Sequence, residues 1–489
     1  MVKIDFLKNK GRYQQTDIGT STLFIDTFKD ELVYCADIGD WYFWNGKHWQ
    51  RDTVLKRNEL IKKLYAYCIE YLTTQKLEQK EQSDLLKYYL KLSDKNFRDK
   101  ILKDSLSVNP ITSKQFDKHK FLFNCQNGTY NFETGEFREH RKEDYLTDIS
   151  NVVYDKDADC PRFKQYLEEV FEDDKAKIDY LLKISAYCLT GDTSRECFFV
   201  LYGDKTRNGK GTFVGTLTHL AGTYSQTLKP DSITKKNINN GGSGATPDIA
   251  KLKNCRIASV SELEEGMILN VALMKTFTGG DTQTARFLHK EEFEFVPQFK
   301  IIINTNVLPK MSDDSIFKSD RIHLLCFDRH FELNERDYGL KDKLKNEISG
   351  IFNLIAEHYQ KLNQENFILP KSTQNTIEKY QLNSNNILLF IKENMFESKS
   401  SYEKASVVYE KYTKWCEDCG YKALGKKSFR ERFERQGAEY IEKSRHATDR
   451  GESDVSMWYK GFTFTEPKPK QADILYEPIE VEDEKQLPF

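Results

Sequence analysis

The sequence predicts an α/β fold built on a parallel sheet that carries a phosphate-binding loop. Three apolar runs of strand length support this prediction, at residues 198–202, 255–260 and 299–303, and a polar segment follows each of them. A glycine-rich loop follows the first run, in the stretch VLYGDKTRNGKGT over residues 200–212, before a helical pattern resumes. A buried strand that leads into such a loop and then into a helix is typical of nucleotide-phosphate sites.

The loop contains the groups that a triphosphate requires. Glycines let consecutive backbone N–H groups point at the phosphates, and Lys210 would neutralise the β and γ phosphates. Because Gly211 follows the lysine, Thr212 is expected to supply the hydroxyl for Mg²⁺. The predicted ATP-binding residues are Gly203, Asn208, Gly209, Lys210, Gly211 and Thr212. For this loop alone, a glycine-rich surface turn with a chance lysine is the alternative.

Polar side chains follow the second and third apolar runs. Glu262 comes just after the second run, where a carboxylate can hold Mg²⁺ and polarise water, and Glu264 competes for the water-activating role. Asn306 follows the third run, where an amide can orient the attacking water beside the γ-phosphate. Acids and amides at strand ends also cap loops, so each residue alone has a structural alternative.

An arginine that stabilises the transition state is expected after the third strand. Ser319-Asp320-Arg321 offers Arg321, and Arg329 is the competing candidate. An isolated arginine is more often solvated, so this assignment depends on the motifs around it.

From residue 121 to about 327 the chain closely resembles the superfamily 3 helicases of the phage and plasmid primase-helicase type, which are related to the poxvirus replication helicase. The motifs that carry the resemblance are NCQNGTYNFETGEF, ATPDIAKLKNCRIASVSELEEG and LMKTFTGGDTQTARFLHKEEFEFVPQFKIIINTNVLP. The resemblance implies an AAA+-like P-loop ATPase core that uses ATP and Mg²⁺. It also implies that Lys210 binds phosphates, Glu262 binds Mg²⁺ and Asn306 senses the γ-phosphate. Many relatives have an Arg-Arg pair where this chain has Asp320-Arg321, which weakens the transfer to Arg321.

The function implied by this resemblance is an ATP-dependent replicative DNA helicase of a phage, plasmid or other mobile element. It would form a homo-hexameric ring that moves along single-stranded DNA and opens forked DNA. Two alternatives are an origin-binding initiator with helicase activity and a protein-remodelling ATPase. No priming activity is expected, since residues 1–120 hold neither a zinc-binding cysteine set nor a clear carboxylate cluster.

Residues 284–295 alternate apolar and polar positions on either side of a charged centre, which predicts a β-hairpin with His289 and Lys290 at its tip. The resemblance implies that this hairpin grips single-stranded DNA in the ring channel. A solvated hairpin whose charges protect a sheet edge is the alternative.

Composition indicates a multidomain protein without a generally basic surface. The chain has 489 residues, with 74 basic and 76 acidic side chains and a formal net charge of −2, so any DNA contact has to be local. Ten scattered cysteines are typical of a reducing cytoplasm. No apolar run is long enough to cross a membrane.

Five segments are expected along the chain. Residues 1–120 form an aromatic hairpin, turning at Asn45-Gly46, and a helical region, and residues 121–192 form hairpins and a helical collar. Residues 193–370 form the ATPase core, which includes one amphipathic helix over 340–362, and 371–386 form a polar connector. Residues 387–464 form a small winged-helix domain, and 465–489 form a disordered tail.

Lys426, Lys427 and Arg430 would open the recognition helix of the winged-helix domain. A basic first turn that enters a major groove would bind origin DNA, whereas a winged helix that only packs against protein is the alternative. The last four residues, Gln486 to Phe489, faintly resemble peptides that dock on sliding clamps, and a frayed terminus is the alternative there.

Overall fold

The protein is described from a computed structural model that covers the chain. The described residues are 9, 11–235, 246–287, 292–311, 315–419, 421, 423–447 and 453–465. The chain forms two compact units, Met1–Ile377 and Glu378–Phe489, and each is described by itself. The finer division into five segments stays a prediction.

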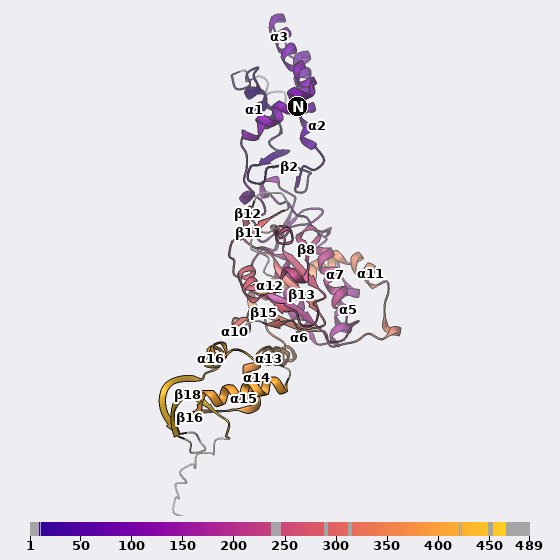
Figure 1. The fold of residues 1–489 in the computed structure, drawn as a ribbon. Helices are drawn as coiled ribbons and strands as arrows, with labels where there is room; N and C mark the ends of the chain where they lie inside the picture. Colours follow the sequence, from indigo (N-terminus) through magenta and orange to yellow (C-terminus); the bar gives the residue numbers. More distant parts are fainter. Residues whose placement is uncertain are drawn as a thin grey trace, which may run out of the picture. The chain divides into compact units, whose positions relative to one another are not determined.

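A five-stranded parallel sheet forms the centre of the first unit (Figure 1). Its strands are β7 (Phe198–Tyr202), β8 (Ser225–Leu228), β9 (Ile257–Ser261), β13 (Lys300–Thr305) and β15 (Ile322–Cys326). They lie in the order β15-β7-β13-β9-β8, and every neighbouring pair is parallel. The α/β fold with a parallel sheet is therefore confirmed, and the three predicted runs are β7, β9 and β13.

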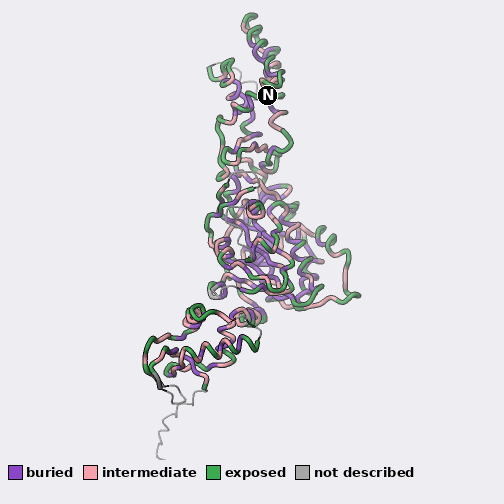
Figure 2. The backbone as a smooth tube through the Cα atoms, viewed as in Figure 1, coloured by how far each residue is buried: buried purple, intermediate pink, exposed green. Residues whose placement is uncertain are grey.

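Both faces of this sheet are buried, which explains why its strands are continuous apolar runs. On one face Phe199 and Leu201 of β7 pack with four helices, and Phe198 and Val200, which alternate with them along the strand, are buried as well. The four helices are α5 (Pro161–Phe171), α6 (Lys175–Leu189), α7 (Lys210–Ala221) and α12 (Ile348–Glu365). Figure 2 shows the buried residues concentrated in this part of the chain.

The strand order creates a reversal point between β7 and β13. From β7 the chain passes through α7 to β8 at one side of the sheet, whereas from β13 it crosses to β15 at the other side. In open parallel sheets, ligands bind at the carboxyl ends of the two strands that flank such a point. We therefore expect a ligand to bind at the residues that follow Tyr202 and Thr305.

The N-terminal part contains the predicted aromatic hairpin. Trp44 and Trp49 face each other across the turn that contains Asn45 and Gly46. The strand β1, which pairs with β2, and the helix α1 were not predicted from the sequence. The elements are α1 (Asp17–Phe28), β1 (Leu32–Cys35), β2 (Asp40–Trp44), β3 (Trp49–Arg51), α2 (Lys56–Thr74), α3 (Gln79–Tyr89) and α4 (Lys95–Asp104).

The hairpins predicted before the collar are also present, as β4 (Leu122–Asn124), β5 (Thr129–Asn131) and β6 (Phe137–Arg138). A buried cation joins them to the sheet: the Arg256 guanidinium, next to the start of β9, donates hydrogen bonds to the carbonyls of Leu122 and Leu189. The collar helices α5 and α6 follow, as predicted.

Between β9 and β15 the chain forms the predicted hairpin and several short elements. The hairpin strands pair in an antiparallel register from Gln283 opposite Phe295 to Arg286 opposite Glu292. Its tip, which includes His289 and Lys290, lies outside the described residues. The elements are α8 (Pro247–Ala250), β10 (Ile268–Leu269), α9 (Val271–Thr278), β11 (Gln283–Arg286), β12 (Glu292–Phe295), β14 (Lys310–Met311) and α10 (Ser315–Lys318).

One expectation for the segment after β15 was wrong. The single helix expected at 340–362 is two helices, α11 (Leu340–Asn346) and α12, separated at Glu347. The Glu347 carboxylate accepts hydrogen bonds from the backbone N–H groups of Arg162 and Phe163, at 3.0 and 2.9 Å, and thereby caps α5. The polar connector expected at 371–386 is mostly helical, as α13 (Lys371–Ser384), and the boundary between the two units falls within it.

The second unit contains the predicted winged helix. Its elements are α14 (Asn386–Asn394), β16 (Phe396–Lys404), α15 (Ala405–Asp418), α16 (Lys426–Glu434), β17 (Glu439–Ala447) and β18 (Ser453–Thr463). The three strands form an antiparallel sheet in the order β16-β18-β17, and β16 was not predicted from the sequence. Phe390, Tyr412, Phe429, Phe433 and Tyr459 lie in its core.

Candidate functional site

The loop between β7 and α7 has two positions that only glycine fits. A Cβ at Gly203 would lie 2.3 Å from Asn208 Nδ2 and 2.5 Å from the carbonyl oxygen of Phe327. Gly209 precedes α7 with a φ of +90°, and a Cβ there would lie 2.7 Å from Val170. Gly211 differs, because a Cβ at that position would meet nothing within 4 Å.

Two side chains hold this loop in place. The buried Asn208 amide donates to the carbonyls of Lys205, at 2.7 Å, and of Phe327 beyond β15, at 3.3 Å. The hydroxyl of the buried Tyr166, on collar helix α5, donates to the Gly209 carbonyl at 2.9 Å. The loop is therefore fixed to the strand beside β7 and to the collar before any ligand binds.

Lys210 lies at the reversal point of the sheet and is only 3% exposed. Its ammonium donates hydrogen bonds to the Gly203 carbonyl at 3.1 Å and to Asn306 Oδ1 at 2.8 Å. Burial lowers the pKa of Lys210 to about 8, because both hydrogen-bond partners are neutral and the negative charge of Asp204 only partly offsets the effect of burial. This buried cation has the electrostatic character of an anion site.

Glu262 and Glu264 are both exposed, and the buried Leu263 separates them. Glu262 has a left-handed backbone with a φ of +64°, and its N–H donates to the Asn304 carbonyl of β13 at 3.2 Å. Its carboxylate has no hydrogen-bond or ion-pair partner in the described part of the chain. A strained backbone that presents an unpaired carboxylate at a strand end is common in functional sites.

Thr212 lies in the first turn of α7 and is half-buried. Its hydroxyl has no hydrogen-bond partner among the described residues, so the oxygen is available. Hydroxyl and carboxylate oxygens are ligands that Mg²⁺ accepts alongside phosphate and water, so Thr212 and Glu262 fit the ion chemically. Across the described ranges, no three His, Cys, Asp or Glu side chains gather as a metal cluster of their own.

Arg321 and Arg329 lie at opposite ends of the strand β15, Arg321 just before it and Arg329 after it. The Arg321 carbonyl accepts from Phe198 N–H at the start of β7, which is the edge remote from Lys210. The Arg321 side chain pairs with Glu196 and donates to Thr278 Oγ1 at 2.7 Å. Arg329 follows the carboxyl end of β15, where it donates to the Glu169 carbonyl and pairs with Glu335. Within one chain, Arg321 is therefore not brought to the loop.

A hollow of about 340 Å³ opens beside the loop. Gly209 and Thr212 form one wall, and the aromatic side chains Tyr166, Phe331 and Tyr338 share the rest with charged side chains of both signs; Tyr338 is 84% exposed. Arg162 also lines the hollow, and its Nη1 atom is buried without a hydrogen-bond partner in the described chain. Sequence analysis missed this hollow, since its walls come from three segments with no shared motif.

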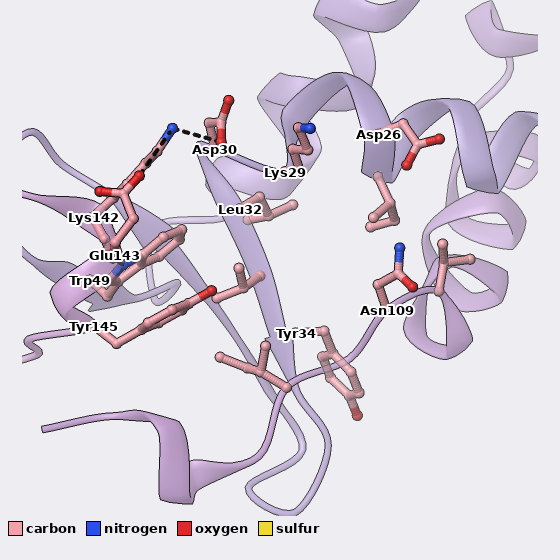
Figure 3. A pocket seen from close by; sticks show the side chains of 14 residues that line it. Asp26, Lys29, Asp30, Leu32, Tyr34, Trp49, Asn109, Lys142, Glu143 and Tyr145 are labelled. Atoms are coloured by element: carbon pink, nitrogen blue, oxygen red, sulfur yellow. Dashed lines mark hydrogen bonds and ion pairs between the residues drawn. The ribbon is translucent and has the colours of Figure 1, made fainter. Parts of the chain in front are cut away.

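A second hollow of the first unit, of about 360 Å³, lies between α1, β1 and residues 142–145 (Figure 3). Its aromatic wall is the stacked pair Trp49 and Tyr145, with ring centroids 5.7 Å apart. Its charged side chains are three acids and two lysines, and one of these lysines, Lys142, contacts Asp30 at 2.6 Å. This balance gives the hollow no preference for a phosphate, in contrast to the loop.

In the second unit, Lys426 and Lys427 are exposed at the start of α16. Arg430 is held differently: its guanidinium lies 3.7 Å from the centre of the Tyr440 ring and contacts Glu434 at 3.6 Å and Glu442 at 3.4 Å. The two lysines are therefore exposed to a ligand, whereas Arg430 contacts Tyr440 and Glu442 of β17.

Two family models match the chain. A model described as "D5 N terminal like" matches residues 21–172, and one described as "Poxvirus D5 protein-like" matches residues 382–462. "Putative helicase L207/L206" of Acanthamoeba polyphaga mimivirus is 28% identical over 418 residues, which are 77% of this chain and 43% of that protein. The chain is therefore similar to D5-like proteins of poxviruses and to viral proteins named as putative helicases.

The chain has further viral relatives. "Putative helicase 121R" of Invertebrate iridescent virus 3 is 23% identical over 66% of the chain and 39% of that protein. The chain thus spans about two-fifths of the length of these two relatives. The matched models flank residues 173–381, which hold the sheet and the loop, so the roles of Lys210, Glu262 and Asn306 are argued from their geometry.

Among solved structures, the chain is similar to "The apo structure of NrS-1 C terminal region (305-718)", with a TM-score of 0.46 and 12% identity over 89% of this chain and 97% of that one. In the described part of the chain, no helix is long and apolar enough to span a membrane.

Proposed function

We propose that the chain is an ATP-dependent DNA helicase that moves along single-stranded DNA during replication of a virus or other mobile element. The observation that carries the proposal is the buried Lys210 ammonium, held between Gly203 and Asn306 at the reversal point of the parallel sheet. The D5-like family models and the names of the viral relatives favour a helicase over other phosphate-binding proteins.

In this proposal the triphosphate occupies the loop from Gly203 to Thr212. Lys210 exchanges its neutral partners for phosphate oxygens, and the N–H groups at the start of α7 donate to the same oxygens. Mg²⁺, held by Thr212 and Glu262, would screen charge between the phosphates. Asn306 and Glu262 follow adjacent strands and would orient and polarise the attacking water.

The nucleoside would occupy the hollow beside the loop. Gly209 and Thr212 belong both to this hollow and to the loop, so the phosphates and the base of one nucleotide can reach both. The exposed Tyr338 ring offers stacking area for a purine, whereas the Arg329 guanidinium already lies 4.4 Å from the centre of the Phe331 ring.

Arg321 would act on the nucleotide of a neighbouring subunit. Its place at the edge of the sheet remote from Lys210 agrees with action in trans, because it does not approach the loop of its own chain. A closed homo-hexamer would supply this arginine to every site. The His289-Lys290 hairpin tip would then grip single-stranded DNA in the channel.

A strand-displacement assay on a forked duplex tests the proposal. Lys210→Ala should lose both ATP hydrolysis and displacement, and Lys290→Ala should lose displacement. Lys229→Ala, which removes an exposed lysine after the edge strand β8, is the matched control and should retain both. Displacement by Lys210→Ala at the wild-type rate would refute the proposal.

An origin-binding initiator is the second candidate, and the winged-helix unit favours it. A footprint on the element's origin that depends on residues 387–464 would support that role. ATP hydrolysis that does not respond to single-stranded DNA would instead indicate a remodelling ATPase.

A further inference from the structure

The winged-helix unit contains a hollow of about 510 Å³ that the proposed ATP and pore sites do not use. It lies between the start of α15, the helix α16 and the strands β17 and β18. Its volume is within the range of about 300–1,000 Å³ that small-ligand sites occupy. A major-groove reader requires a protruding helix, so a hollow next to the basic helix needs its own explanation.

The lining of this hollow is aromatic and cationic. Phe429 and Tyr459 are buried at its base, and Tyr409 and Tyr440 are half-buried along its sides. The cations are Lys426, Lys427 and Arg430, and the lining contains no acidic residue. Its charge therefore complements an anion, and its rings complement a flat aromatic group.

Hydrogen bonds fix the two half-buried rings. The Tyr409 hydroxyl donates to the Leu424 carbonyl at 2.8 Å, and the Tyr440 hydroxyl donates to the Met457 sulfur at 2.7 Å. Met457 is 45% exposed and gives the mouth of the hollow an adaptable apolar wall. The Arg430 guanidinium lies 3.7 Å from the centre of the Tyr440 ring, so a planar ligand would stack on this Arg430–Tyr440 pair.

The two lysines carry unneutralised charge at the rim. Lys426 and Lys427 are exposed and form no ion pair with any described residue, whereas Arg430 is neutralised by Glu434 and Glu442. We therefore expect Lys426 and Lys427 at the rim to contact phosphate, and the base of the hollow to accept an uncharged ring.

We propose that this hollow binds one unstacked base of single-stranded DNA, with its backbone phosphates on Lys426 and Lys427. An aromatic platform below a basic rim is the arrangement that binds single strands, since each base stacks on a ring while lysines hold the backbone. In a duplex the base faces are covered by their neighbours, so a hollow of this kind offers them nothing. The inference rests on the proposed DNA function but concerns a separate site.

Photocrosslinking of the full chain tests it. A thymine oligonucleotide with 5-iodouracil at each position in turn is irradiated with the protein, and the attached peptides are identified by mass spectrometry. We expect attachment to residues of α15, α16 and β18 that line the hollow. Tyr440→Leu should reduce this attachment by about tenfold or more, since base stacking is lost. The Lys426→Ala/Lys427→Ala double variant should reduce it similarly and lower its dependence on salt.

Tyr421→Leu is the matched control, because Tyr421 is an exposed tyrosine of the same unit that stacks on Trp415 outside the hollow. It should crosslink like the wild type. Equal attachment of a blunt duplex would overturn the inference in favour of duplex binding, and attachment confined to other elements would overturn it outright. ATP hydrolysis by wild type and Lys210→Ala, measured in parallel, tests the proposed function independently.

Discussion

The Lys210 ammonium donates a 2.8 Å hydrogen bond to Asn306 Oδ1, joining the residues that follow two adjacent strands, β7 and β13. Lys210 ends the loop that follows β7, and Asn306 directly follows β13, 96 positions further along the chain. Both of its partners are neutral, so the protein holds an unpaired buried charge until an anion arrives.

The affinity for ATP should therefore depend on pH through Lys210. Its pKa of about 8 lies below its ordinary value of 10.5, and the phosphates would raise it again, so a proton is taken up on binding above about pH 8. We expect the affinity to weaken up to about tenfold per pH unit above that point. Calorimetry in buffers of different ionisation enthalpy measures the uptake directly.

Lys210→Arg is the comparison for this measurement, because its guanidinium stays charged throughout and should take up no proton. Without nucleotide, the free energy of unfolding should change with pH in the opposite direction to the affinity for ATP. Between about pH 8 and 10.5 the unfolded chain binds more protons at Lys210 than the folded one, so the free energy of unfolding should rise with pH. An affinity for ATP that does not change with pH would contradict the assignment.

Glu262→Gln should lower ATP hydrolysis by roughly 100-fold or more, because the amide keeps the shape of the side chain but cannot polarise water. Glu264→Gln should have little effect, since Glu262 is the residue tied to β13 through the Asn304 carbonyl. Single-turnover hydrolysis with a parallel nucleotide-binding assay separates chemistry from binding. The reverse order of the two variants would assign the role to Glu264.

The loop glycines should respond oppositely to alanine. Gly209→Ala places a Cβ against Val170 at a φ of +90° and should lower stability by about 1–3 kcal/mol, together with loss of nucleotide binding. Gly211→Ala adds a Cβ in open space within α7 and should raise stability by up to about 1 kcal/mol. Thermal unfolding of both variants measures the difference, and equal melting temperatures would exclude this account of the loop.

Mixing two inactive variants should test Arg321 in trans. Lys210→Ala subunits retain Arg321 and Arg321→Ala subunits retain the loop, so mixed rings contain some complete sites and should recover part of the ATP hydrolysis. A mixture of Lys210→Ala with Glu262→Gln should recover none, because both changes lie on the same side of each site. If the first mixture also stays inactive, Arg329 becomes the better candidate.

The sequence predicted the elements whose side-chain pattern is local. The run at 198–202 followed by Asn208-Gly209-Lys210 specifies a strand, a loop and a helix, and the aromatic hairpin follows from Asn45-Gly46. Contacts between distant parts of the chain could not be predicted from the sequence. The break at Glu347 depends on the capping of α5, a helix almost 190 positions earlier, which no local pattern reports.

The site shows the same division. Lys210, Glu262 and Asn306 could be chosen because each follows an apolar run, and parallel strands end at a common edge. The place of Arg321 at the opposite edge and the hollow lined by Arg162 and Tyr338 depend on how distant segments pack. The tip residues His289 and Lys290 stay a prediction.

Glu347 holds the first turn of α5, and one turn further along that helix Tyr166 holds the carbonyl of Gly209. The hydrogen bond from Tyr166 to the Gly209 carbonyl thereby connects the helix α5 directly to the loop. If subunits of the proposed ring contact one another through α5, a tilt of this helix would also displace Gly209, so ring closure and nucleotide binding would change together.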